Sequence, residues 1–469
     1  MENAGKQKHP KGLWLVNTAM TLQGYCGYAF GSIFILFLTA DVSQNGLGLS
    51  VAKASSMIAI YSSICYLSSI VGGWITDNYL GIQKSLILAC FVNAIGDIAL
   101  FVVKPSVPNL WGCFSILVIS SAFFKSQISQ LVGSLYDKDD LTRKDAAYAL
   151  FYSAINIGAF FGPIISGLIA DQWFAEIAAT GEIVSFGYKY VFLMNGILMI
   201  GVSIFIFLTA PKLLGDVAKY PVNGKGAAKA AKEAGKKEVV EHQPLTQTEK
   251  KRILSMVILF VFVVLFWSAW FQTQSSFSIL MNDLVQREYG SFTIPVPWLV
   301  AYNSILCVIF APLMAKLWLK LGQSKRGDLS IPTKMALGML FTAGAFVILI
   351  IGINTLGGVV DGSKKMSLIF VLIAYLALTI GELCISPIGL AMFNKLAPVR
   401  YGSLAMGAWY LSNCFANLIS GKLSGLTSTM GYVQIFGSIS AVLIVFALML
   451  LVLRKGIVKL MALDEFEEA

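Results

Sequence analysis

Long apolar runs alternate with short polar segments along almost the whole chain. The run that begins with "MSLIFVLIAYLAL" at Met366 meets no charged residue before Glu382. A helix needs about 20 predominantly apolar residues to cross the hydrocarbon core of a bilayer. We therefore expect twelve membrane-spanning helices. They cover residues 12–40, 52–75, 84–103, 110–136, 146–170, 188–210, 253–277, 295–317, 333–353, 366–393, 403–419 and 432–453.

The composition agrees with this pattern. Of the 469 residues, 57% are hydrophobic and 13% are charged, whereas soluble domains have about 45–50% apolar and about 25% charged residues. The first run is too long for a cleavable signal peptide and lacks a small-residue cleavage site. The predicted fold class is therefore an all-α, multi-pass integral membrane protein in the cell membrane, surrounded by lipid.

Basic residues predict the orientation of the chain. With a cytoplasmic amino terminus, 27 Lys and Arg residues lie on the cytoplasmic side, 7 lie on the outer side, and Lys125 lies within a span. Cytoplasmic loops of membrane proteins carry such an excess of positive charge. We expect both termini in the cytoplasm. The net charge of +10 then needs no nucleic acid as a partner.

One long polar segment, residues 211–252, divides six runs from six runs. We expect a first six-helix bundle over residues 1–210, a cytoplasmic linker over 211–252, a second bundle over 253–454 and a cytoplasmic tail over 455–469. This arrangement suggests the major facilitator architecture, in which two halves rock around a binding site near the middle of the membrane.

The chain offers no pattern for a metal, a cofactor or an enzyme. All seven cysteines lie inside apolar runs without paired spacing, and both histidines lie in aqueous segments. We therefore expect no disulfide framework and no metal site. No nucleophile–base pair is evident in any span, which argues against catalysis.

A short motif follows the second run. "GGWITDNYLGIQK" fits the spacing G-x-x-x-D-x-x-x-G with Gly73, Asp77 and Gly81. Glycines in a two-helix turn permit close backbone approach, and the acid can accept positive charge at a helix end. The motif resembles the loop between spans two and three of major facilitator proteins. We assign these three residues to conformational gating.

Several longer segments follow one another in an order that is informative. They are "HPKGLW" from His9, "FFKSQISQLVGSLY" from Phe123, "FYSAINIGAFFGP" from Phe151, "FWSAWFQTQSS" from Phe266, "IPTKMALG" from Ile331, and "GELCISPIGL" from Gly381 followed by "KLAP". In this order they resemble the proton-dependent oligopeptide transporter (POT) family. The resemblance implies the major facilitator fold and proton-coupled peptide transport.

Three charged residues, Asp97, Lys125 and Glu382, lie well within the spans. A charge at that depth costs from about 2.5 kcal/mol upward and usually faces a cavity or a partner. Lys125 belongs to the first half and Glu382 to the second, so a small zwitterion could bridge them, carboxylate to Lys125 and ammonium to Glu382. Without ligand the two could pair, or Glu382 could be protonated.

The resemblance implies the same roles. It links Lys125 to the peptide carboxylate and to proton coupling, and Glu382 to the peptide amine. A purely structural ion pair is the less favoured alternative. For Asp97 two interpretations stay open: a second proton site, or a structural hydrogen bond to a neighbouring helix, and the structural one has the edge.

Neutral side chains complete the expected site. The resemblance implies that Asn156 and Asn303 hydrogen-bond the peptide amine and backbone, and buried amides need partners. Further candidates for the binding site are Tyr28, Trp270, Gln272, Trp409 and Ser412.

The chain also departs from the family pattern. Where the family has E-x-x-E-R-F-x-Y-Y in span one, this chain reads "MTLQGYCGY", with Met20 and Gln23 at the two acidic positions and Gly24 in place of the arginine. Phe271 stands where many members have an acid. Proton coupling then depends on Glu382 and, if Asp97 also binds a proton, on Asp97. Two alternatives remain: an uncoupled or differently coupled facilitator of a non-peptide amino-acid derivative, and a receptor-like member that does not transport.

Overall fold

The computed structural model describes residues 8–136, 140–179, 183–221, 245–290, 292–324, 327–357, 363–396 and 402–461. Within this part of the chain, a helix lies at each of the twelve predicted segments. The continuous ones are α1 (Lys11–Thr39), α2 (Val51–Ile75), α3 (Ile82–Val102), α4 (Val107–Ser134), α5 (Leu141–Leu168), α6 (Tyr188–Leu213), α10 (Val296–Gly322), α11 (Ile331–Asn354), α12 (Leu368–Leu396), α13 (Gly402–Met430) and α14 (Tyr432–Met461).

The chain divides into two compact units. One comprises Met1–Gly48 with Ile64–Val240, and the other comprises Leu49–Ser63 with Glu241–Ala469. The first part of α2 therefore belongs to the second unit. There its Ser55 hydroxyl lies 2.9 Å from the Ser424 hydroxyl of α13, and its Ser63 hydroxyl donates to the Cys414 carbonyl of α13 at 2.9 Å.

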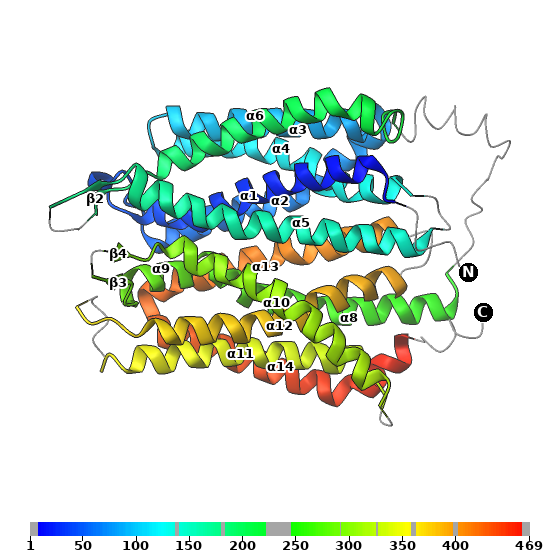
Figure 1. The fold of residues 1–469 in the computed structure, drawn as a ribbon. Helices are drawn as coiled ribbons and strands as arrows, with labels where there is room; N and C mark the ends of the chain where they lie inside the picture. Colours follow the sequence, from blue (N-terminus) through cyan, green and yellow to red (C-terminus); the bar gives the residue numbers. More distant parts are fainter. Residues whose placement is uncertain are drawn as a thin grey trace. The chain divides into compact units, whose positions relative to one another are not determined.

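In the first unit, α1 packs along α5 and α6, and α3 packs between α4 and α6 (Figure 1). Glycines allow the closest of these contacts. A Cβ atom added at Gly158 of α5 would lie 2.4 Å from the Thr21 carbonyl oxygen and 2.6 Å from the Tyr25 amide nitrogen of α1. The backbones of α1 and α5 therefore touch, which is the role of small residues in membrane helix pairs.

Replacing Gly158 with Ala is expected to destabilise the protein by about 3 kcal/mol, because overpacking costs about 1–3 kcal/mol and both contacting groups are backbone. Gly201→Ala in α6 is the matched control, since a Cβ there meets nothing within 4 Å. Alanine is a better helix former than glycine by about 1 kcal/mol, so this variant should melt at or above the wild-type temperature. Thermal unfolding in detergent measures both. Equal melting of Gly158→Ala and wild type would contradict the close contact.

The seventh segment is not the single helix over 253–277 that hydropathy predicted. It consists of α8 (Gln247–Trp270), a 3-10 turn η4 (Phe271–Gln274) and α9 (Ser276–Leu284). Helix α8 begins with a capping box between Thr246 and Glu249. The break falls at Ser275, whose φ and ψ of −137° and −94° are not helical. Neighbouring side chains take up local hydrogen bonds there, for example from the Ser278 hydroxyl to the Thr273 carbonyl at 2.9 Å.

In the second unit, α11 lies beside α12 and α14 (Figure 1). Within the described residues, eleven helical stretches are long and apolar enough to cross a membrane. Helix α13 lies at the remaining predicted segment and is not one of them. One face of α13 carries buried polar side chains at helical spacing, which lowers its hydropathy. They are Asn413, Asn417, Ser420, Ser424 and Thr427.

The motif after α2 forms a tight turn within the first unit. Thr76–Leu80 make one π-helical turn, η2, and Gly81 follows with φ +77°. A Cβ at Gly81 would lie 2.4 Å from the Lys219 carbonyl oxygen. The Gln83 side chain donates to the Val217 carbonyl at 2.7 Å. The predicted glycine role is therefore found at Gly81, whose contact is the turn that follows α6. Gly73 is half-buried, as is Asp77.

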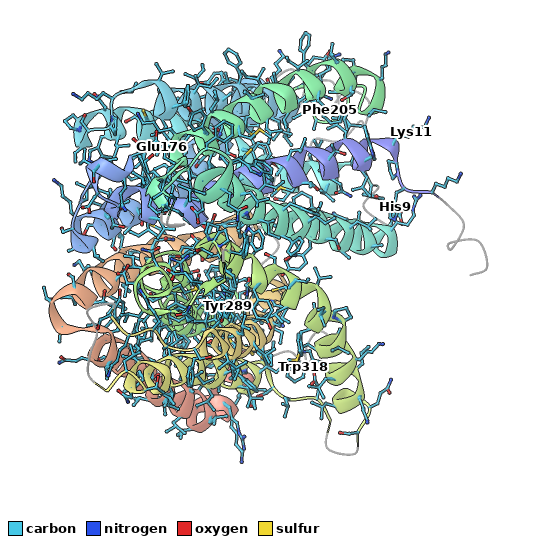
Figure 2. The ribbon with its side chains drawn as sticks, turned by 60° about the vertical axis from the view of Figure 1, so that its left-hand side comes forward. His9, Lys11, Glu176, Phe205, Tyr289 and Trp318 are labelled. Atoms are coloured by element: carbon cyan, nitrogen blue, oxygen red, sulfur yellow. The ribbon has the colours of Figure 1, made fainter. Side chains whose placement is uncertain are left out.

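Two short antiparallel hairpins were not predicted. One pairs β1 (Glu176–Ile177) with β2 (Ile183–Ser185), and the other pairs β3 (Glu288–Tyr289) with β4 (Phe292–Thr293). Glu176 and Tyr289, labelled in Figure 2, mark their positions in the two units. Strands of two or three residues are too short to produce an alternating pattern that a sequence could reveal.

Candidate functional site

The Glu382 carboxylate lies in the interior of the second unit. Glu382 belongs to α12 and is 9% exposed. Its Oε2 atom accepts a hydrogen bond from the Trp270 indole nitrogen of α8 at 2.9 Å and another from the Asn303 amide of α10 at 3.1 Å. Three helices therefore converge on one carboxylate oxygen, and three of the predicted site residues meet at one place.

A hydroxyl on α12 orients the Asn303 amide. Asn303 Nδ2 donates to Thr379 Oγ1 at 2.9 Å as well as to Glu382. The Thr379 hydroxyl in turn donates to the Tyr375 carbonyl at 2.8 Å. Both N–H hydrogens of the Asn303 amide therefore take part in hydrogen bonds, which fixes the orientation of this side chain. The sequence analysis missed Thr379, although it lies three residues before Glu382 and such residues share one face of a helix.

Aromatic rings surround the Trp270 side of this carboxylate. The Trp267 and Trp270 ring centroids are 5.3 Å apart, and the Phe271 ring is 5.7 Å from both. Aromatic walls exclude water and strengthen electrostatic interactions inside them. The Trp267 indole nitrogen is buried, and in the described part of the chain it has no hydrogen-bond partner.

Within the described part of its own unit, the charge of Glu382 has no cationic partner. Among the described residues of that unit, no Lys, Arg or His nitrogen lies within 4.0 Å of the carboxylate, since the ion pair found there joins Lys334 to Asp328. Two neutral hydrogen bonds orient the carboxylate but do not neutralise it. A site of this kind can bind an ammonium group or a proton.

Trp409 and Ser412 on α13 serve a different part of this unit. Trp409 is buried, and its ring packs 5.5 Å from the Phe393 ring and against the backbone of Gly389 in α12. The Ser412 hydroxyl donates to the Trp409 carbonyl at 2.5 Å and is fully buried. Trp409 therefore packs α13 against α12, whereas the Ser412 hydroxyl bonds within α13, and neither is a hydrogen-bond partner of Glu382 among the described residues.

The polar side-chain atoms of Gln272 form hydrogen bonds inside the second unit and do not reach solvent. It is 0% exposed. Its amide nitrogen donates to the Ser420 carbonyl and hydroxyl of α13 at 3.1 and 3.0 Å, and its Oε1 accepts from the Ser276 hydroxyl at 2.6 Å. The amide therefore ties the break between α8 and α9 to α13.

Replacing Gln272 with Met, which has a similar volume, is expected to destabilise the protein by about 1–3 kcal/mol, because it leaves buried polar partners unpaired. The affinity for substrate should stay within about twofold. Gln434→Met on the exposed surface of α14 is the matched control and should leave stability unchanged. Thermal unfolding and equilibrium binding measure the two quantities. A large loss of substrate affinity in a variant of normal stability would instead identify Gln272 as a substrate-binding residue.

In the first unit, Lys125 lies on α4 beside an aromatic ring. Its Nζ atom is 4.1 Å from the centroid of the Tyr66 ring on α2, a distance at which a cation interacts with the ring face. The Lys125 side chain is half-buried. This contact orients the ammonium group without neutralising it.

The other candidates of the first unit lie on α1, α3 and α5. Asn156 is 8% exposed, and its amide donates to the Tyr152 carbonyl of its own helix at 2.9 Å. Tyr28 is half-buried on α1. Asp97 on α3 is 3% exposed and accepts a hydrogen bond from Asn93 at 2.6 Å. Asp97 is thus bonded within its own helix, not to the neighbouring helix that the structural interpretation expected.

A polar cluster at the start of α1 was also missed. His9, labelled in Figure 2, lies before α1, and its Nδ1 is 2.7 Å from the Tyr136 hydroxyl beyond α4. Arg143 stacks near the same tyrosine and pairs with Asp140. The hydrogen bond from the Arg143 guanidinium lowers the pKa of the half-buried Asp140 carboxyl. The cluster joins the amino terminus to the connection between α4 and α5.

Comparison with known proteins gives consistent matches. A model of the POT family matches residues 84–219 and 225–442. Peptide transporter YePEPT of Yersinia enterocolitica is 27% identical, over 85% of this chain and 84% of that protein. A di-/tripeptide transporter of Lactococcus lactis is 25% identical, over 98% and 99% of the two chains.

Solved structures match over nearly the full length. A mutant of peptide transporter POT in complex with alafosfalin has a TM-score of 0.83 and 26% identity, covering 97% of this chain and 96% of that one. A POT family transporter in complex with 5-aminolevulinic acid has a TM-score of 0.82 and 25% identity, covering 96% and 97%.

Proposed function

The chain belongs to the POT family of membrane transporters, and we propose that it moves di- and tripeptides, or similar small zwitterions, across the cell membrane by alternating access. It is a multi-pass membrane protein with the major facilitator fold and not an enzyme. The similar structures hold alafosfalin and 5-aminolevulinic acid. A substrate that is small and peptide-like agrees with both.

The observation that carries the proposal is the Glu382 carboxylate, which Trp270 and Asn303 orient without neutralising it. A peptide's terminal ammonium supplies the missing charge and forms a charge-assisted hydrogen bond. Lys125 in the first unit is assigned to the peptide carboxylate, because it is a half-buried ammonium held by a neutral ring. Asn156 and Tyr28 are assigned to the peptide backbone.

The assignment of the other residues and of the topology completes the proposal. Gln272 and Ser412 are assigned to helix packing because their side-chain polar atoms form internal hydrogen bonds, and Trp409 because its ring packs against α12. We place both termini in the cytoplasm, with residues 211–252 as the linker between bundles over 1–210 and 253–454. The turn at Gly73, Asp77 and Gly81 is assigned to gating, and lipids contact the exposed apolar surface.

Proton coupling through Glu382 is part of the proposal, and one observation favours an uncoupled alternative. Phe271, which stands where many family members have an acid, packs against Trp270 beside Glu382. Met20 and Gln23 likewise replace acids. With fewer titratable groups near the substrate, fewer protons can bias the two conformations. A facilitator of a peptide-like amino-acid derivative is therefore the second candidate.

The test is uptake of a labelled dipeptide into proteoliposomes, with and without an inward proton gradient. Accumulation above the external concentration only with the gradient supports symport. Uptake that stops at equal concentrations supports the facilitator. Protein-free liposomes give the background. An absence of uptake and of exchange for a panel of dipeptides and amino-acid derivatives would overturn both.

A further inference from the structure

The first unit contains a buried acid that the substrate site does not use. Asp97 lies five residues before the end of α3 and is 3% exposed, and its Oδ2 accepts a hydrogen bond of 2.6 Å from Asn93, one turn earlier. Among the described residues no Lys, Arg or His nitrogen lies within 4.0 Å of this carboxyl. One neutral amide does not offset the charge of an ionised carboxylate.

The two residues that interact with Asp97, Asn93 and Cys26, have neutral polar neighbours on other helices. On α4, the Ser120 hydroxyl donates to the Ala89 carbonyl at 2.8 Å and lies 3.3 Å from Asn93 Oδ1. On α1, the Cys26 thiol is close enough to interact electrostatically with Asp97. On α6, the Asn195 amide donates to the Cys26 carbonyl at 3.1 Å. Asn93 and Cys26 therefore link the carboxyl to a small cluster of neutral polar groups.

The basic residues of these four helices do not reach the cluster. Lys84 lies near the start of α3, thirteen residues from Asp97, which is about 20 Å along a helix. Lys125 on α4 lies over the Tyr66 ring. Lys11, Lys189 and Lys212 lie at helix ends. Two other titratable groups interact with Cys26: the buried Cys90 thiol of α3 and the buried Tyr25 hydroxyl of α1.

An aspartic acid at this position lowers the stability of the protein, which is explained if its ability to bind a proton has a function. A buried ionised carboxylate without a cationic partner is destabilising, whereas Asn would accept the same hydrogen bond from Asn93 without carrying a charge. In the same cluster, Asn195 Oδ1 is buried and has no partner among the described residues.

From this geometry we infer that Asp97 is an intramembrane proton-binding site, separate from the peptide-binding carboxylate Glu382. The inference rests on the proposed function. When the cluster faces water, the carboxylate takes a proton from water and becomes a neutral acid. When the opposite side opens, the same O–H bond breaks and the proton returns to water. Asn93 and Ser120 hold the carboxyl in place and are positioning residues.

The variant Asp97→Asn tests this inference, because it keeps the acceptor for Asn93 and removes the titration. In proteoliposomes with an inward proton gradient, the ratio of internal to external dipeptide is expected to fall from about tenfold or more to about one. Exchange of labelled for unlabelled dipeptide without a gradient should stay within about twofold of wild type. The matched control is Ser203→Ala in α6, which removes a buried hydroxyl bonded to the Ile87 carbonyl and should keep gradient-driven accumulation.

Two outcomes overturn the inference: accumulation by Asp97→Asn equal to that of wild type, or loss of exchange together with accumulation in a normally melting protein. A spectroscopic readout keeps it separate from the proposed function. Infrared difference spectra of purified wild type between low and high pH should contain a protonated-carboxyl band that Asp97→Asn lacks. If the wild-type protein transports no peptide, the proposed function is wrong. The protonated-carboxyl band still tests whether Asp97 binds a proton. Identical spectra of the two proteins would overturn it.

Discussion

Replacing Glu382 with Gln is expected to lower the affinity for a free dipeptide about a hundredfold. Gln keeps the shape and can still accept hydrogen bonds from Trp270 and Asn303, but it lacks the charge that an ammonium group needs. Losing one partner of a buried, hydrogen-bonded charge pair costs about 2–5 kcal/mol, and about 2.8 kcal/mol corresponds to a hundredfold in affinity. Equilibrium binding and uptake both measure the effect.

Comparing two forms of the substrate distinguishes the loss of the Glu382 charge from a general loss of protein structure. Wild type should prefer a free dipeptide over its N-acetylated form by about a hundredfold, and Glu382→Gln should bind the two forms about equally. Trp270→Phe is the matched control, because it removes one neutral donor and keeps the carboxylate. Its affinity should fall much less than that of Glu382→Gln, because the carboxylate that pairs with the ammonium group is retained. A persistent preference for the free amine in Glu382→Gln would place the ammonium elsewhere.

Replacing Lys125 with Gln is expected to have a comparable effect at the other end of the peptide. The half-buried Lys125 ammonium is oriented by the Tyr66 ring, which does not neutralise it. Its removal leaves a peptide carboxylate without that partner, so the affinity for a free dipeptide should fall about a hundredfold, by the same reasoning as for Glu382. A dipeptide with an amidated carboxyl terminus should bind wild type and Lys125→Gln about equally.

Two further variants define the role of the Lys125 contact. Tyr66→Phe keeps the ring face below the ammonium, so its affinity should stay within about twofold of wild type. Lys125→Arg keeps the charge and can also stack on the ring, and should lose less than tenfold. If Lys125→Gln discriminates between free and amidated dipeptides as well as wild type does, the carboxylate binds elsewhere.

Several features of this protein were evident from the sequence because their signals are local. Apolar runs separated by polar segments predicted helices that the structure places at the same segments, since a lipid environment requires each span to satisfy its own backbone hydrogen bonds. Glu382 and Lys125 stood out for the same reason, as a charge within an apolar run is rare and costly.

The tertiary structure decided what these residues contact. Glu382 gains Trp270 and Asn303 only because α8, α10 and α12 converge, and no spacing along the chain encodes that meeting. Gln272 was a reasonable ligand candidate by residue type, yet the break between α8 and α9 turns its amide toward Ser420. Hydropathy cannot detect such a break, because side chains supply the hydrogen bonds that the helix loses.

The same division applies to Asp97. The sequence by itself determined that an acid lies within the third span, and it left the proton site and the structural hydrogen bond as alternatives. Only the packing of α1, α4 and α6 around α3 gave the carboxyl neutral neighbours and, within the described residues, no cation. Burial and partners are properties of the assembled helices, whereas hydropathy is a property of each helix alone, so the sequence determined the spans and the tertiary structure determined their chemistry.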